Sequence, residues 1–443
     1  MQFQSVEFLF FFLPCFLAVY YMFPCTWRGG VLLAGSLVFY ALASNGRCWQ
    51  VAGALGLTVM TYAVARYLFR HKSRRVLALS LGALGGALVF FKLWRGGNYL
   101  PAGMSFYVFY LAACLMDSYS RKLRHLEGLV DFGAKALMFP RLLSGPIAEP
   151  GTLTRQQPVT GHPRGRFHSG IQKLILGLAM KVLVADRLAG LWSQAAVTGY
   201  ESISTPFAWL ALVAYALRLY LDFWGYSLMA LGLGDMLGIS LPKNFDNPYA
   251  ARSVSEFYRR WHMTLGKWFR DYIYIPLGGS RKGTVRTILN LLAVWLLTGL
   301  WHGVSANFLL WAGILVFFII NEKLWLGKWL QKSRVLCHAY TVCVILLSWV
   351  PFAIGDRGEL LMYAGRLFGL LGRTLNGRDF LIWGKVYCPY LAAGLLLATP
   401  WPERLWRKIR GSLWTDAALF VVFWIVVYCI CTAEQSPFLY FQY

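Results

Sequence analysis

Long apolar runs separated by short polar connections extend along almost the whole chain. A helix that crosses a bilayer needs about 20 mostly apolar residues, and a somewhat shorter run suffices when flanking residues help. We therefore expect an all-α polytopic membrane protein with roughly ten to twelve membrane helices. The apolar runs cover residues 8–22, 30–42, 51–69, 76–93, 103–116, 171–184, 208–221, 288–300, 308–320, 335–354, 390–398 and 417–431.

Composition supports a membrane location. Hydrophobic residues make up 58% of the 443 residues and charged residues 14%, whereas a soluble domain has about a quarter of its residues charged. The net charge is +24, and the basic residues lie between apolar runs, with the densest early clusters at 66–75 and 121–124. Basic connections stay in the cytoplasm, so we expect the N-terminus outside, contacts with membrane lipid, no nucleic-acid partner, and a multi-pass protein of the inner (plasma) membrane.

Two intervals fit neither a spanning helix nor a soluble loop. Residues 139–150, FPRLLSGPIAEP, combine prolines and an arginine with apolar residues. Residues 241–279 are polar but rich in aromatic side chains, a mixture typical of helices at the membrane interface. Within 241–279 we expect two short helices, one capped by Ser253 or Ser255 and running through Arg270, and a turn at Gly278 and Gly279. Both intervals are interpreted as re-entrant or interfacial segments of a single membrane domain, 1–443, although 139–150 also fits an ordinary cytoplasmic loop.

Histidines are the strongest candidates for chemistry. His302 follows an apolar helix within LTGLWHGVSANFLLW and lies beside Trp301, so it is predicted at membrane depth, where ionisable groups are costly and indicate function. An imidazole accepts protons near neutral pH, which makes His302 a candidate general base. His262, in RRWHMTLGKWFRD, is the second candidate, to orient a substrate or hold His302. The alternatives are a histidine packed at a helix corner for His302 and an interfacial side chain for His262.

Two further features, a charged pair in an apolar run and the aromatic end of the chain, could serve either structure or function. Asp222 is the single acid in the long run 209–233, and Arg218 lies one helical turn before it, so we expect a buried pair that supports the bundle. The end of the chain, 432–443, is aromatic; it forms either part of an interfacial belt or a tail that returns to the bundle with Tyr440 in a cavity. The sequence contains no nucleophile elbow, phosphate-binding loop or metal-ligand spacing, so we expect no metal and no bound cofactor.

At these motifs the chain resembles the bacterial branch of the membrane-bound O-acyltransferase family. The matching segments are GMSFYVFY at 103–110, FPRLLSGPI at 139–147, LDFWGYSLMALGLG at 221–234, the block at 242–281 and GLWHG at 299–303. They resemble the alginate O-acetylation branch and, nearly as well, the teichoic acid D-alanylation branch. Trp224 and Leu228 depart from the alginate-type pattern, which leaves the acceptor open.

The resemblance implies a helix bundle around a central funnel, with His302 as the catalytic histidine, His262 as the second family histidine and Tyr440 as an acyl carrier. The expected activity moves an acyl group, in the simplest form acetyl, from acetyl-CoA or a carrier-protein thioester to an extracytoplasmic polysaccharide. The group passes either directly or through a separate periplasmic transferase. D-alanyl transfer, transport without chemistry and a scaffold role are the alternatives; Asp222, Arg218 and Trp301 are expected to bind substrate or support the site.

Overall fold

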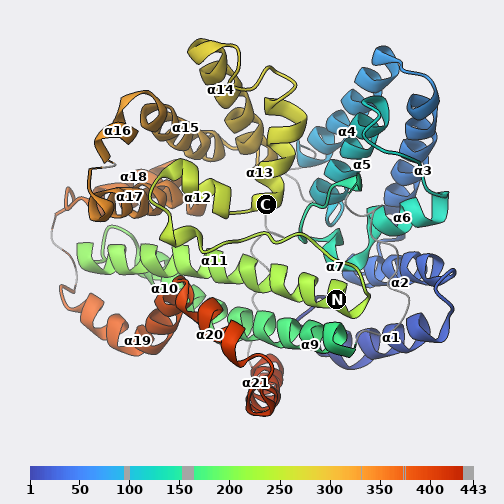
Figure 1. The fold of residues 1–443 in the computed structure, drawn as a ribbon. Helices are drawn as coiled ribbons and strands as arrows, with labels where there is room; N and C mark the ends of the chain where they lie inside the picture. The colour runs from blue at the N-terminus through green and yellow to red at the C-terminus, as the bar shows by residue number, and fades with distance from the viewer. Residues whose placement is uncertain (94–99, 152–163, 331, 373, 375, 433–443) are drawn as a thin grey trace.

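The computed structural model describes residues 1–93, 100–151, 164–330, 332–372, 374 and 376–432, and every regular element in these ranges is helical (Figure 1). The N-terminal part contains η1 (Glu7–Phe12), α1 (Leu13–Met22), α2 (Arg28–Ala43), α3 (Cys48–Arg70), α4 (Arg74–Leu93), α5 (Met104–Tyr119), α6 (Leu129–Leu137) and α7 (Phe139–Leu142). The middle part contains α9 (Arg164–Ala179), η3 (Met180–Ala185), α10 (Asp186–Thr198), α11 (Thr205–Met236), η4 (Pro248–Ala250), α12 (Val254–Arg260), α13 (Met263–Phe269) and η5 (Arg270–Tyr274). The C-terminal part contains α14 (Gly283–His302), α15 (Ala306–Asn321), η6 (Glu322–Leu326), α16 (Gly327–Leu330), α17 (Arg334–Ala353), α18 (Arg357–Leu367), α19 (Asp379–Leu397), α20 (Trp401–Ile409) and α21 (Leu413–Thr432).

Eight helices in the described ranges are long and apolar enough to cross a membrane, and two shorter apolar helices, Glu7–Met22 and Arg28–Ala43, accompany them. The expected runs at 103–116 and 171–184 fall in α5 and in α9 with η3, which are not among the eight. Nearly every residue of α5 is buried, because this helix forms part of the protein core. Apolar composition therefore does not distinguish a core helix from a spanning one.

Helices α9 and α11 run side by side through the molecule (Figure 1). They touch at two pairs of glycines, Gly170 with Gly232 and Gly177 with Gly225. A Cβ atom added to Gly177 would lie 2.5 Å from the backbone oxygen of Gly225, and one added to Gly232 would lie 2.5 Å from that of Gly170. Small residues at such a crossing let two backbones approach closely, which is how helices associate in membranes.

The interval at 139–150 is not a spanning helix. Helix α7 covers four of its residues, and the chain that follows is irregular and buried, with Ser144 0% and Ile147 5% exposed. A Cβ at Gly145 would lie 2.2 Å from the Cα of Arg141, so the turn requires glycine there. Irregular backbone away from water is tolerated where protein surrounds it, and the burial of this segment meets that condition.

The interval at 241–279 forms the expected short helices, with one difference. Ser253 caps α12, because its hydroxyl accepts a hydrogen bond from the backbone N–H of Glu256 at 2.9 Å, and Glu256 pairs with Arg260 at 2.6 Å. Gly278 and Gly279 both have positive φ, 110° and 57°, which confirms the turn. The prediction of one helix running through Arg270 is wrong, because the backbone at His262 adopts the left-handed conformation and separates α12 from α13.

Candidate active site

His302 is the last residue of α14, at a point where the helix ends against aromatic side chains. Its ring lies 4.9 Å from the ring of Trp311 and 5.2 Å from that of Phe352, measured between centroids. The neighbouring Trp301 ring is 4.6 Å away. The His302 side chain is 7% exposed. This packing places the imidazole in a largely apolar environment, in which hydrogen bonds and charges act strongly.

His262 lies between α11 and α14. Its ring contacts Phe223 at 4.7 Å and Trp301 at 6.1 Å, and the residue is 3% exposed. The Trp301 ring also contacts the ring of His302, so this tryptophan lies against both histidines. His262 lies outside the candidate spanning helices, and burial lowers its pKa to about 3, so the ring is neutral at pH 7.

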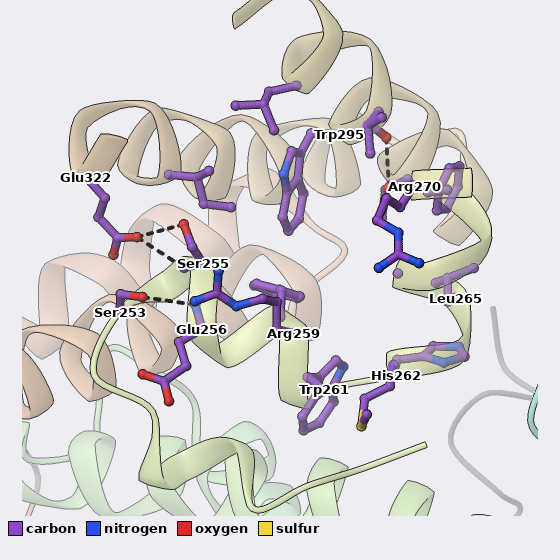
Figure 2. A pocket seen from close by; sticks show the side chains of 18 of the residues that line it. Ser253, Ser255, Glu256, Arg259, Trp261, His262, Leu265, Arg270, Trp295 and Glu322 are labelled. Carbon is purple, nitrogen blue, oxygen red and sulfur yellow. Dashed lines mark hydrogen bonds between the residues drawn. The ribbon is translucent and has the colours of Figure 1, made fainter. Parts of the chain in front are cut away.

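A cavity of about 1360 Å³ is lined by both histidines. Trp261, Trp295, Trp311 and Trp349 form apolar parts of its wall. In Figure 2, Arg259, Arg270 and Trp295 lie around the same space as His262. Basic side chains outnumber acidic ones in the lining: the basic ones are Lys243, Arg252, Arg259, Lys267, Arg270, Lys323 and Arg334, and the acidic ones are Glu256 and Glu322. Lys243, Lys267 and Arg270 form ion pairs with acids outside the lining, so the excess of positive charge comes from the other four basic side chains. The cavity therefore combines an apolar wall with an excess of positive charge, which suits an anionic molecule with an apolar end.

The wall formed by α12 is fixed by Glu322, the first residue of η6. Its carboxylate accepts a hydrogen bond from the backbone N–H of Val254 at 2.6 Å. It also accepts from the backbone N–H and the hydroxyl of Ser255, at 3.1 Å and 2.9 Å (Figure 2). A carboxylate at a helix N-terminus satisfies N–H groups that have no partner within the helix. Helix α13 is held against α5 by Trp268. Its indole N–H donates a hydrogen bond to the backbone carbonyl of Phe109 at 2.9 Å, and its ring stacks on the Phe109 ring.

Asp222 does not pair with Arg218 as expected. It forms an ion pair with Lys181 of η3 at 2.9 Å, and Lys181 also contacts Asp186 at 2.5 Å. The side chains of Lys181 and Asp222 are 2% and 3% exposed. The glycine contacts between α9 and α11 bring η3, and with it Lys181, against α11. The residue spacing within α11 could predict only a partner on the same helix, Arg218. Among the described residues that line the cavity, neither Asp222 nor Arg218 occurs.

The other residues and sites considered from the sequence are Trp301, Tyr440 with the C-terminal tail, and metal-binding groups. Trp301 does not line the cavity but packs beneath it, between Phe106 and Phe109 of α5. Tyr440 and the tail at 433–443 lie outside the described residues. In the part of the chain that the structure describes, no group of three or more His, Cys, Asp and Glu side chains is arranged to hold a metal ion.

Two polar residues beside the histidines were not predicted from the sequence. Lys92, near the end of α4, donates a hydrogen bond to the backbone carbonyl of Trp301 and lies 5.8 Å from the centre of its ring. Asn244 accepts a hydrogen bond from Nδ1 of His262 at 3.0 Å. Asn244 lies within the family-like block at 242–281, and this was the one feature of the sequence that could have indicated a role in the site. For Lys92 the sequence shows only a lysine at the end of an apolar run, which does not indicate such a role.

Comparison with known proteins identifies the family of this chain and several of its relatives. The model of the membrane-bound O-acyltransferase (MBOAT) family matches residues 48–352. The chain is 32% identical to a probable alginate O-acetylase, AlgI, of Pseudomonas putida, over the whole of both chains. It is 29% identical to a peptidoglycan O-acetyltransferase of Helicobacter pylori, over 84% of this chain and 81% of the other. A teichoic acid D-alanyltransferase of Bacillus subtilis is 26% identical over 45% of this chain and 54% of its own.

The family model covers more than half of the chain, and the Pseudomonas putida relative spans all of it. The family match and the long apolar helices together identify a multi-pass membrane protein and an O-acyltransferase. The chain therefore belongs to the membrane-bound O-acyltransferase family, in which it resembles the alginate O-acetylases over most of its length.

Proposed function

We propose that this enzyme transfers an acyl group, in the simplest form acetyl, from a cytoplasmic thioester to the hydroxyl groups of an extracytoplasmic polysaccharide. The observation that carries the proposal is the meeting of His262 and His302 in a cavity with an excess of basic residues. The names of the full-length relatives support O-acetylation and a polysaccharide acceptor. The donor is acetyl-CoA or a carrier-protein thioester, whose phosphate groups the basic lining suits.

In this mechanism His302 is the general base. It removes the proton from the acceptor hydroxyl as the oxygen attacks the thioester carbonyl carbon. The carbon–sulfur bond then breaks, and the leaving thiolate takes the proton back from the His302 imidazolium. Positioned proton transfer of this kind contributes about 10²–10⁴-fold to a rate. His302 packs between the rings of Trp311 and Phe352 in the cavity wall, which holds its imidazole in position for this proton transfer.

Tyr440 is proposed as the first acceptor in a relay. A phenol has an unperturbed pKa of about 10, so a neighbouring imidazole can assist its acylation, and the resulting aryl ester is reactive enough to pass the acyl group on. The group then reaches the polysaccharide directly or through a separate periplasmic transferase. D-alanyl transfer to teichoic acid is the second candidate, favoured by the partial match to a D-alanyltransferase.

The experiment is acyl transfer by purified protein in vesicles with radiolabelled acetyl-CoA. We expect label on the wild type and none on Tyr440→Phe, with Tyr428→Phe as a matched control on α21. If label persists on Tyr440→Phe and polymer acylation in cells is normal, the relay through Tyr440 is refuted. The proposed acyltransferase activity would still stand. Failure of the wild type to take label from both acetyl-CoA and an acetylated carrier protein, while an acceptor glycan is present, would contradict the proposed function.

A further inference from the structure

His262 occupies a backbone conformation that histidine rarely adopts. Its φ and ψ angles are 44° and 51°, in the left-handed region, where a residue with a side chain is strained. The strain is of order 1–3 kcal/mol and persists where surrounding structure fixes it, often at functional sites. The break in the helix lets the loop at 241–247 reach the ring: the backbone N–H of Met263 donates to the carbonyl of Asn244 at 2.9 Å.

A chain of hydrogen bonds fixes the orientation of the Asn244 amide. The backbone N–H of Ile147 donates to the hydroxyl oxygen of Thr264 at 3.0 Å. The backbone N–H of Thr264, which can only donate, points to Oδ1 of Asn244 at 3.4 Å, and the Thr264 hydroxyl donates its proton to the same oxygen at 2.9 Å. On the other side, the amide nitrogen of Asn244 donates to the hydroxyl of Ser227 at 3.3 Å. The amide oxygen of Asn244 therefore faces Thr264 and His262, and it can only accept.

The same oxygen determines which nitrogen of His262 carries the proton. Nδ1 lies 3.0 Å from Oδ1 of Asn244, so Nδ1 must donate. A neutral imidazole has one N–H, which leaves the lone pair on Nε2. Nε2 is buried and has no hydrogen-bond partner among the described residues, and His262 lines the cavity. A buried acceptor without a partner costs stability, and a substrate that donates to it removes that cost.

We propose that Asn244 is a positioning residue that holds His262 in the Nδ1-protonated tautomer, so that Nε2 accepts a hydrogen bond from an O–H or N–H group of the bound substrate. The inference rests on the proposed function for the identity of the substrates, and it adds a specific role for His262 beside the base His302. Both a sugar hydroxyl and an amide of a pantetheine-type donor carry the required group. Kinetics distinguish them: loss of the contact raises KM for the acceptor in the first case and for the donor in the second.

Other titratable side chains share the cavity with His262 and must stay unchanged in the test. They come from each surrounding element: Lys243 from the loop, Arg259 from α12, Lys267 from α13, His302 from α14, Glu322 from η6 and Arg334 from α17. The variants are therefore confined to Asn244 and Thr264. Asn244→Asp keeps an oxygen for Nδ1, Asn244→Leu removes it, Thr264→Ser keeps the hydroxyl and Thr264→Val removes it.

We expect Asn244→Leu to lower kcat/KM by about 10- to 100-fold, the range found when the partner that orients a metal-bound histidine is lost. Thr264→Val should show a smaller loss and Thr264→Ser near-normal activity. Asn244→Asp should retain more activity than Asn244→Leu. Its carboxylate favours the charged imidazolium and raises the pKa of His262, so the acid limb of the pH–rate profile should move to higher pH. The matched control is Asn290→Leu, a buried amide that donates to the carbonyl of Gly279.

A measurement independent of turnover is ¹⁵N NMR of histidine-labelled protein in detergent, with the His262 signal assigned by its absence in His262→Gln. We expect neutral His262 with the proton on Nδ1 in the wild type and a mixture of tautomers in Asn244→Leu. A proton on Nε2 in the wild type would overturn the proposal. A second combination of results would also overturn it. In that case the pH profile of Asn244→Asp is unshifted, and Asn244→Leu loses no more activity than Asn290→Leu.

Discussion

Lys92 on α4 donates a hydrogen bond to the backbone carbonyl of Trp301, the residue next to His302. That carbonyl belongs to the last turn of α14, whose final C=O groups have no partner within the helix. A cation at a helix C-terminus is also favoured by the helix dipole. Lys92 therefore holds the end of the helix that presents His302, although it comes from a segment about two hundred positions earlier in the chain.

Replacing Lys92 with Met should lower kcat about tenfold while the protein still folds and inserts. The substitution leaves the Trp301 carbonyl unsatisfied, which costs roughly 1–3 kcal/mol, and part of that cost appears as a less well-positioned His302. Lys92→Arg keeps a donor and should retain more activity. Lys122→Met, which removes a largely exposed lysine near Asp117, is the control; equal losses in both methionine variants would exclude a specific role for Lys92.

The buried pair of Lys181 and Asp222 should be important for stability and not for chemistry. Lys181→Met leaves two carboxylates without their shared cation, and breaking a buried pair costs about 3–5 kcal/mol. The double variant Lys181→Met with Asp222→Asn should recover part of that loss, measured as the thermal unfolding temperature in detergent. A double variant that recovers stability and remains inactive would instead place Asp222 in the reaction.

The crossing of α9 and α11 should not tolerate a side chain at Gly177. Its Cβ would lie 2.5 Å from the backbone oxygen of Gly225, so Gly177→Ala must push the two helices apart and should lower the unfolding temperature. Gly82→Ala on α4 is the matched control, because open space surrounds that position. Alanine there should be neutral or slightly stabilising, since it favours helix over glycine. Equal behaviour of the two variants would show that close packing is unimportant.

Several parts of the fold and site were predictable because the signal is local. The cap at Ser253, the turn at Gly278 and the aromatic character of 241–279 follow from residue types at short spacing. The resemblance identified His262 and His302, and both line the cavity in the structure.

Features that depend on segments distant in sequence were not predictable. The spacing of Arg218 and Asp222 within one helix favoured a pair, but the cation that reaches Asp222 is Lys181 from another helix. The break at His262 was missed because its left-handed backbone depends on contacts with Asn244 rather than on local propensity. Lys92 illustrates the same limit, since a lysine at the end of an apolar run gives no sign of the helix end that it contacts.

The central claim, that His302 carries out proton transfer in the reaction, is tested most directly by acyl transfer in vesicles with His302→Ala. His168→Ala, at an exposed histidine paired with Asp416, is the control. We expect His302→Ala to insert and fold normally and to lose at least about 10²-fold in transfer rate, with His168→Ala unaffected. Transfer at the wild-type rate by folded His302→Ala would contradict the account.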